Sequence, residues 1–392
     1  MLKSGVLGPP FTHPTLPNFA HFIGATTPRS SPSHYLDAIS TLIETYRHEV
    51  RTPLSTMNDH QHADSSKISD GIPLVVNTMG WVKGLGADLN HKIENMLEPT
   101  DVFNTQAPSR EAHQNPSPSY TPRYSDSYSA FCSDVVMGSP ATQIHVLDPA
   151  PNPTTTGLTA ADHRNISFLS YFHALFPKHC CPSELDQITA YRWDTSRPLC
   201  AVPPFEVDCS LAFDGVVLTG AGSEDVVEEE IGRVLNGAVV GLVACEPGMI
   251  NEHSDSKALK AFGIPYTRGY DLPSPVSSRC VGLALIRGIS SPVPVSEPVP
   301  STTSPMKTFF HLLTPTPYAI LRQARVLIKG EVELPIWGML DFRSFFKEEE
   351  IDDVAGVEPE NVPYLQWGKA PEGALGAERR RIRRNLMRRG QM

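Results

Sequence analysis

The sequence is poor in cysteine, in long apolar runs and in net positive charge. Its seven cysteines contain no Cys-x-x-Cys pair, which argues against a zinc site or a disulfide framework and favours a reducing compartment. No apolar run reaches the length of a membrane span and the first residues lack a signal-peptide core, so we expect a soluble intracellular protein without membrane contact. The formal net charge of −10 argues against a generally basic nucleic-acid coat.

Proline, in contrast, is abundant. The 37 prolines are too many for one compact unit, so loops and linkers should occupy much of the chain. The stretch 106–140 is rich in Pro, Ser and Tyr and predicts a disordered insertion. A second Pro/Ser-rich stretch, 290–306, predicts a linker.

Hydrophobic patterning predicts an α/β part followed by a β-rich part. In the first part, a buried strand ends in a polar, Gly-rich turn and is followed by a helix, which is typical of a parallel sheet. The elements expected there are strands at 20–24, 74–78, 101–105 and 142–147 and helices at 32–50, 87–97 and 160–176. The β-rich part has expected strands at 205–209, 215–219, 238–245, 281–286, 309–314 and 324–337.

These patterns divide the chain into three parts. Residues 1–203 are expected to form a partial α/β domain, and residues 204–345 a β-rich C-terminal domain. Residues 346–392 form a tail that is first acidic and then densely basic.

The most informative motif runs from Thr78 to Lys83, at the end of a predicted strand. The carboxyl end of a strand in an α/β sheet is where ligands bind. Gly80 permits a tight turn, and Trp81 offers a flat face on which a base can stack. The side chains of Thr78 and Lys83 are suited to holding phosphate oxygens. The alternative is a capped loop in which Trp81 closes the core.

This motif resembles the substrate clasp of the eukaryotic polynucleotide 5′-hydroxyl kinases, and most closely their nucleolar, pre-rRNA-processing branch. The similarity covers most of the chain outside the insertion and the linker. Further matching stretches are Gly8–Pro14, Phe22–Pro32, Tyr35 and Leu36, Leu169–His173, Leu313–Pro317, Val326–Asp341 and Val362–Gln366.

The resemblance implies an incomplete P-loop kinase-type parallel sheet with flanking helices, followed by a β-rich C-terminal domain. It also implies ATP and Mg²⁺ as cofactors of the complete family members and RNA with a 5′-hydroxyl end as substrate. Family members carry a Walker A loop, GxxxxGK[ST], and an Asp-containing Walker B segment upstream of the stretch that matches Gly8–Pro14. The sequence contains no GxxxxGK[ST], and neither Gly84–Asn90 nor Gly220–Asp225 substitutes for it.

Phosphoryl transfer depends on these two segments for phosphate positioning and for Mg²⁺. We therefore expect this chain to begin downstream of both, to contain no catalytic residue, to bind neither ATP nor a metal ion tightly, and to be inactive alone. Loss of the two strands that feed these segments should leave raw sheet edges at 20–24 and 74–78. The isolated chain should then be poorly soluble, unless a partner or a missing upstream exon completes the sheet.

The resemblance further implies a lid and a partner-docking tail. Arg164 falls where the family places lid arginines, but Phe168 stands one turn later where a second basic residue is common, and a plain surface arginine is the alternative. The tail resembles the segment that engages an endoribonuclease partner, with Trp367 as the anchor and a rim formed by Arg379, Arg380, Arg381, Arg383 and Arg384. Nonspecific RNA contact or a nuclear-import signal is the alternative for the tail.

Two functional hypotheses follow. The first is a polynucleotide 5′-hydroxyl kinase of nuclear, nucleolar rRNA processing, in which Thr78, Gly80, Trp81 and Lys83 grip the RNA. The second is a non-catalytic scaffold that binds an endoribonuclease through its β-rich domain and tail.

Overall fold

The computed structural model describes residues 12–51, 72–81, 83–105, 142–147, 159–177, 188–249, 259–261, 264–268, 272–290, 308–334 and 339. The predicted insertion at 106–140, nearly all of the predicted linker and the tail at 346–392 lie outside these residues. Trp367 and the five tail arginines therefore stay sequence predictions.

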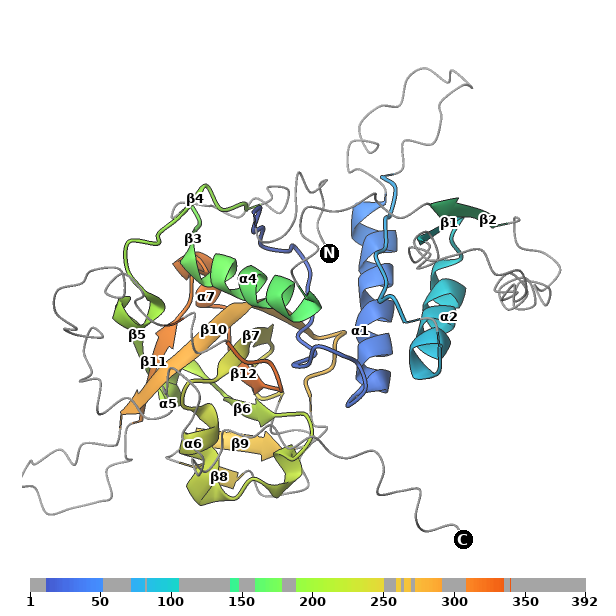
Figure 1. The fold of residues 1–392 in the computed structure, drawn as a ribbon. Coiled ribbons are helices and arrows are strands. Elements are labelled where there is room, and N and C mark those ends of the chain that lie inside the picture. The colour runs from blue at the N-terminus through green and yellow to red at the C-terminus, as the bar shows by residue number, and fades with distance from the viewer. Residues whose placement is uncertain are drawn as a thin grey trace, which may run out of the picture.

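An eight-stranded mixed sheet forms the centre of the described chain (Figure 1). Its strand order is β5-β11-β10-β7-β12-β6-β9-β8. β12 is parallel to β6 and β6 is parallel to β9, whereas the other neighbouring strands are antiparallel. In this order the strands span Phe205–Asp208, Phe309–Leu313, Ser278–Ser290, Val239–Cys245, Val326–Lys329, Gly215–Leu218, Ile264–Arg268 and Leu259–Ala261.

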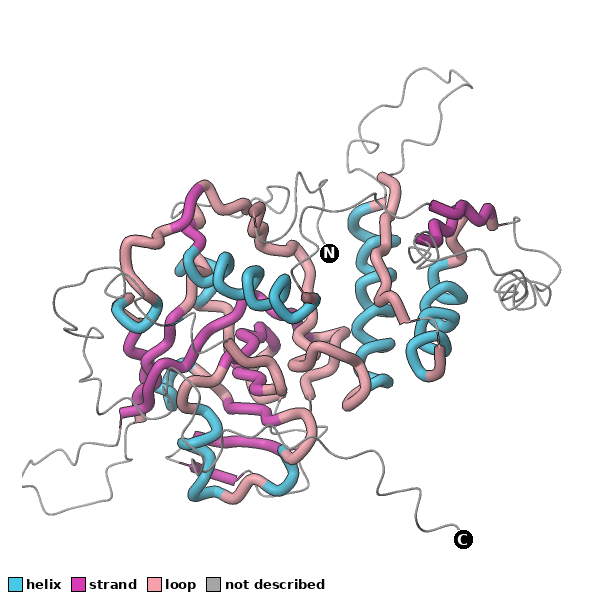
Figure 2. The backbone as a smooth tube through the Cα atoms, viewed as in Figure 1, coloured by secondary structure: helices cyan, strands magenta, loops and turns pink. Residues whose placement is uncertain are grey.

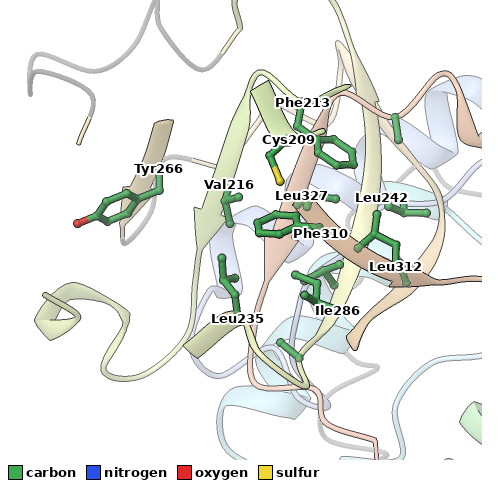
Figure 3. Packing of buried hydrophobic residues seen from close by; sticks show 14 of the residues in the cluster. Cys209, Phe213, Val216, Leu235, Leu242, Tyr266, Ile286, Phe310, Leu312 and Leu327 are labelled. Carbon is green, nitrogen blue, oxygen red and sulfur yellow. The ribbon is translucent and has the colours of Figure 1, made fainter. Parts of the chain in front are cut away.

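The main core lies against one face of this sheet. Leu242, Ile286, Phe310 and Leu327 come from four different strands, and each is at most 1% exposed (Figure 3). Phe213 follows the short helix α5 (Cys209–Ala212), and Leu235 ends α6 (Ile231–Leu235). Burial raises the pKa of the Cys209 thiol to about 12, so this cysteine acts as a packing residue.

The β-rich part follows the sequence prediction closely. All six expected strands are present, although β12 covers only four residues of the expected 324–337. The prediction missed β8 and β9, the two-residue pair β3 (Ala174–Leu175) and β4 (Arg192–Trp193), and the short helices α5, α6 and α7 (Tyr318–Leu321).

Helix α1 (Pro32–Thr45) lies beside the large sheet, and α2 (Leu85–Leu97) packs on the side of α1 that faces away from the sheet (Figure 1). A π-helical turn, Tyr46–Val50, continues α1, so the helix predicted at 32–50 is confirmed. The strands predicted at 101–105 and 142–147 are confirmed as β1 (Asp101–Thr105) and β2 (Gln143–Leu147), which form a parallel pair separate from the large sheet. This pair exposes apolar side chains, with Phe103 at 61% and Val146 at 58%.

Two predicted strands are wrong. Residues 72–81 form an extended loop beside α1 (Figure 2), and Val75 is 89% exposed. A strand needs a neighbour for its backbone hydrogen bonds, and the described residues supply none to this segment. Residues 20–24 also form no strand. The Cys280 amide donates a hydrogen bond to the Ala20 carbonyl, and Phe22 packs against buried side chains of the large sheet, but these contacts do not form a strand ladder.

Helix α4 (Ala160–His173) packs on the large sheet. Thr159 and Asp162 form a reciprocal capping box that begins the helix. Phe172 is buried with Leu285 and Leu313, and the hydroxyl of Tyr171 accepts a hydrogen bond from the amide of Leu283 at 2.8 Å. These contacts join α4 to strands of the predicted C-terminal domain, across the predicted boundary at 203/204.

The backbones of Gly24 and Gly330 meet where β12 ends. The carbonyl of Gly24 accepts bonds from the amides of Glu331 (2.6 Å) and Val332 (3.2 Å). A Cβ atom on Gly330 would lie 2.1 Å from the Gly24 oxygen and 2.4 Å from its Cα atom. Only glycine at position 330 permits this approach, which fixes the turn that leads into α1.

We predict that Gly330→Ala lowers the free energy of unfolding by about 1–3 kcal/mol, because two backbones must separate. Chemical denaturation measures the change. Gly288→Ala is the matched control, since its Cβ would meet only His311 at 3.7 Å and needs no unusual backbone angle. Equal stability of the two variants would contradict the role of the Gly24–Gly330 contact.

Acid should destabilise the junction between α1 and the sheet. His21 and His34 line one small cavity with Val243 and Ile328. Burial, with His34 as a second cause, lowers the pKa of His21 from 6.5 to about 4. Between pH 6.5 and about pH 4, His21 binds a proton in the unfolded chain but not in the folded chain. The contribution of neutral, buried His21 to stability is therefore complete above pH 6.5 and is lost as the pH falls toward 4.

We therefore expect the thermal midpoint to fall across this range and to fall less steeply in His21→Gln. Thermal melts between pH 7.5 and pH 4.5 measure it, with His48→Gln on an exposed site as the control. Identical pH profiles for the wild type and His21→Gln would refute the assignment.

Candidate functional site

The segment 72–81, here called the clasp segment, runs along α1 from its C-terminal to its N-terminal end. At the beginning, the Ile72 amide donates to the Arg51 carbonyl at 3.4 Å, and the Tyr46 hydroxyl donates to the Ile72 carbonyl. At the end, Trp81 lies beside Arg29, two residues before the N-cap Ser31. The contacts at both ends keep the extended segment close to α1.

Helix α2 holds the end of the clasp segment. The side-chain amide of Asn90 donates to the carbonyls of Met79 (3.1 Å) and Trp81 (3.2 Å). Leu89 and Ile93, on the buried face of α2, are 2% and 1% exposed, so the helix that presents Asn90 is itself firmly packed. The sequence analysis missed Asn90, since a single helical asparagine gives no signal of its own.

Gly86 makes room for the indole. A Cβ atom at this position would lie 2.2 Å from the Cβ and 2.6 Å from the Cε3 of Trp81. Trp81 thus packs directly against the first turn of α2, which begins after Gly84 at a backbone φ of +59°. Trp81 is half-buried, whereas Thr78, Gly80 and Lys83 are exposed.

The guanidinium of Arg29 covers the indole of Trp81. Its Cζ atom is 5.0 Å from the ring centroid, which is within the range of a cation–π interaction. Arg29 is exposed and comes from the turn between Gly24 and α1. The structure therefore brings together Thr78, Gly80, Trp81 and Lys83 on one loop, as its sequence requires, and adds Arg29, which the sequence analysis did not identify.

Arg164 occupies an exposed position in α4. The contacts that fix α4 run to β10 and to the segment before α7, through Tyr171, Leu283 and Thr316. No described contact joins Arg164 to the clasp segment, and its role as a lid residue stays a prediction.

The described glycine-rich turns do not fit a nucleotide triphosphate. The turn after β6 contains Gly220 and Gly222, both with positive φ, but the amide of Ala221 donates to the carboxylate of Glu331 at 2.9 Å. The Glu331 carboxylate therefore already accepts a backbone amide that a phosphate oxygen would need as its donor. At the start of α2, Trp81 fills the space over Gly86. Neither turn carries the Gly-Lys-Ser/Thr sequence that holds phosphate and Mg²⁺.

Metal-ligating side chains do not gather in the described part of the chain, where no group of three or more His, Cys, Asp or Glu residues is placed to hold an ion. Among the cysteines that the structure describes, Cys209, Cys245 and Cys280 form no disulfide bond. Among the described helices, none has the length and apolar composition needed to span a membrane.

We predict that Gly86→Ala displaces Trp81, because the added methyl group overlaps the indole. Acrylamide quenching reports the exposure of Trp81 in a chain whose other tryptophans, Trp193, Trp337 and Trp367, are replaced by phenylalanine. Quenching should increase in Gly86→Ala and stay unchanged in Gly80→Ala, whose Cβ would have no atom within 4 Å. An unchanged signal in both variants would show that the indole does not pack on α2.

Comparisons with known proteins match the part of the sequence that contains this site. A family described as "mRNA cleavage and polyadenylation factor CLP1 P-loop" matches residues 5–122, which include α1, the clasp segment and α2. The chain is 36% identical over 401 residues to "Polynucleotide 5'-hydroxyl-kinase GRC3" of Cryptococcus neoformans var. neoformans serotype D (strain B-3501A), covering 100% of the chain and 49% of that protein.

More distant fungal proteins with the same printed name also match. The protein of Schizosaccharomyces pombe is 24% identical, with 99% of the chain and 47% of that protein covered. The protein of Gibberella zeae is 28% identical, with 94% and 47% covered. The chain thus spans about half the length of the curated relatives that it matches.

Proposed function

Because this chain belongs to the polynucleotide 5′-hydroxyl-kinase family, we propose that it supplies the part of such a kinase that grips the 5′ end of RNA. The supporting observation is the clasp: an aromatic face and exposed polar residues lie on one loop beside α1, and a cation from the turn before α1 covers the aromatic ring. Single-stranded nucleic acid is bound by such a combination of aromatic side chains and positive charge.

The proposed roles follow from the positions of the side chains. The hydroxyl of Thr78 and the ammonium group of Lys83 are exposed and contact phosphate oxygens. Gly80 leaves open space at the turn, so RNA can approach the backbone closely. Trp81 lies at the centre of the site, and Asn90 and Gly86 fix its place.

The proposed kinase reaction needs ATP and Mg²⁺, which P-loop kinases use in general. The sequence of this chain has no GxxxxGK[ST], and its described glycine turns do not fit a triphosphate. We therefore propose that the 392-residue chain binds RNA but does not transfer phosphate by itself. Arg164 is a candidate lid residue over the reacting phosphates in a protein that contains the P-loop.

The proposed cellular setting is pre-rRNA processing in the nucleolus. It is supported by the resemblance of the sequence to the rRNA-processing branch and by the basic tail at Arg379–Arg389. In this setting an endonuclease leaves a 5′-hydroxyl end on spacer RNA, which is the chemical group that the kinase phosphorylates. The proposed partner is that endoribonuclease, docked through Trp367 and the tail arginines.

A non-catalytic scaffold is the second candidate. The missing GxxxxGK[ST] and the large mixed sheet, which buries its own core, favour it. A scaffold has no need of the clasp, so RNA binding through Trp81 separates the two candidates.

We predict that the 392-residue chain binds 5′-hydroxyl RNA in the micromolar range and transfers no phosphate from labelled ATP. Trp81→Ala should lower RNA affinity about tenfold, because the clasp loses the aromatic ring at its centre. Lys83→Ala should weaken RNA binding and reduce the salt dependence of that binding. Lys92→Ala, which removes the same charge from an exposed position of α2, should have a smaller effect on both quantities.

Fluorescence anisotropy with labelled RNA measures binding, and radiolabel transfer to RNA measures the reaction. Phosphate transfer above background would contradict the proposed inactivity. RNA affinity that is the same in the wild type, Trp81→Ala and Lys83→Ala would contradict the clasp and favour the scaffold.

A further inference from the structure

The arrangement of Arg29 over Trp81 changes the role expected for the indole. Sequence reasoning assigns the flat face of Trp81 to a nucleic-acid base. In the structure a guanidinium already lies over that ring, with its Cζ atom 5.0 Å from the centroid. Arginine stacks on aromatic faces through its planar, delocalised cation, and its N–H donors then point outward in the plane of the group.

The turn that carries Arg29 is fixed at its beginning and at its end. At one end, the carbonyl of Gly24 is bonded to the amides of Glu331 and Val332, and its backbone lies against Gly330. At the other end, the Ser31 carbonyl accepts the Tyr35 amide at 3.1 Å in the first turn of α1. Because the backbone on both sides of Arg29 is fixed, less conformational freedom is lost when this residue binds a ligand.

The charge around Arg29 favours an anion. Within the described part of the chain, no carboxylate lies within ion-pair distance of its guanidinium, in contrast to Arg325, which forms a two-point bond with Asp214. Lys83 lies two residues after Trp81 on the same loop and is exposed. Among the described residues, the cation that lies over the indole is thus not neutralised by a carboxylate.

We propose that Arg29 is the phosphate-binding residue of the clasp and that Trp81 is its positioning residue. The indole orients the guanidinium so that two N–H groups reach the oxygens of one RNA phosphate, a geometry to which the planar group is matched. Trp81 is then a platform for the cation and does not stack on a base. The proposal rests on RNA binding by the clasp.

The test compares two labelled RNAs in a binding titration with the full 392-residue chain. The first is a 5′-hydroxyl oligonucleotide, and the second has the same phosphates but is abasic at its first three nucleotides. The variants are Arg29→Ala, Arg29→Lys, Trp81→Ala and Trp81→Phe. Arg322→Ala, which removes an exposed arginine at the end of α7, is the matched control.

Arg29→Ala should weaken binding of both RNAs roughly five- to tenfold and reduce the salt slope by about 0.7, as expected for one lost phosphate contact on a single strand. Arg29→Lys keeps the charge and should retain the salt slope while it loses roughly threefold in affinity, because an ammonium group lacks the planar fork. Trp81→Phe keeps an aromatic platform and should bind nearly as well as the wild type.

The combined variant Arg29→Ala/Trp81→Ala should bind no more weakly than Arg29→Ala alone, since the two residues act as one unit. Unchanged or tighter binding in Arg29→Ala, or a loss that is confined to the RNA with bases, would overturn the proposal and return Trp81 to base stacking. Wild-type chain that binds neither RNA would refute the proposed function and this assignment together, whereas binding that Arg29→Ala leaves intact refutes the assignment only.

Discussion

The arrangement of the clasp depends on one close backbone contact between residues far apart in the chain. Gly24 and Gly330 touch without side chains between them, and the Gly24 carbonyl takes the amides of the two residues after Gly330. The turn between Gly24 and α1 is thereby attached to the end of β12. Because Arg29 lies in that turn, the large sheet determines where the cation stands relative to Trp81.

A second set of contacts brings Trp81 to the same place from another direction. The clasp segment lies along α1, and Asn90 and Gly86 on α2 hold its last residues. The two helices thereby place an extended, exposed loop accurately enough for the cation–π contact between Arg29 and Trp81, which loops without such support rarely achieve.

Much of the β-rich part could be predicted from sequence, because strands such as β7 read as uninterrupted apolar runs and are buried on both faces. β9 could not, since its proline argues against a strand interior. The strand predicted at 74–78 is wrong for a physical reason. An apolar composition indicates that a segment can be buried, but it does not indicate whether a neighbouring strand is present to pair with it. For the same reason Trp81 could be selected from its sequence context, while Arg29 could not, since their contact joins segments about fifty residues apart in an arrangement set by Gly330.

The position of β12 in the sheet has a consequence for biosynthesis. This strand comes last in the described sheet along the chain but lies between β7 and β6, in the interior of the strand order. While the polypeptide is still emerging from the ribosome, β6 and β7 therefore expose unpaired edges until residues beyond Lys329 are made. Synthesis order and spatial order are opposed here, so the nascent chain depends on protection against aggregation, by chaperones or by an early-binding subunit, from the synthesis of β7 until β12 has been made.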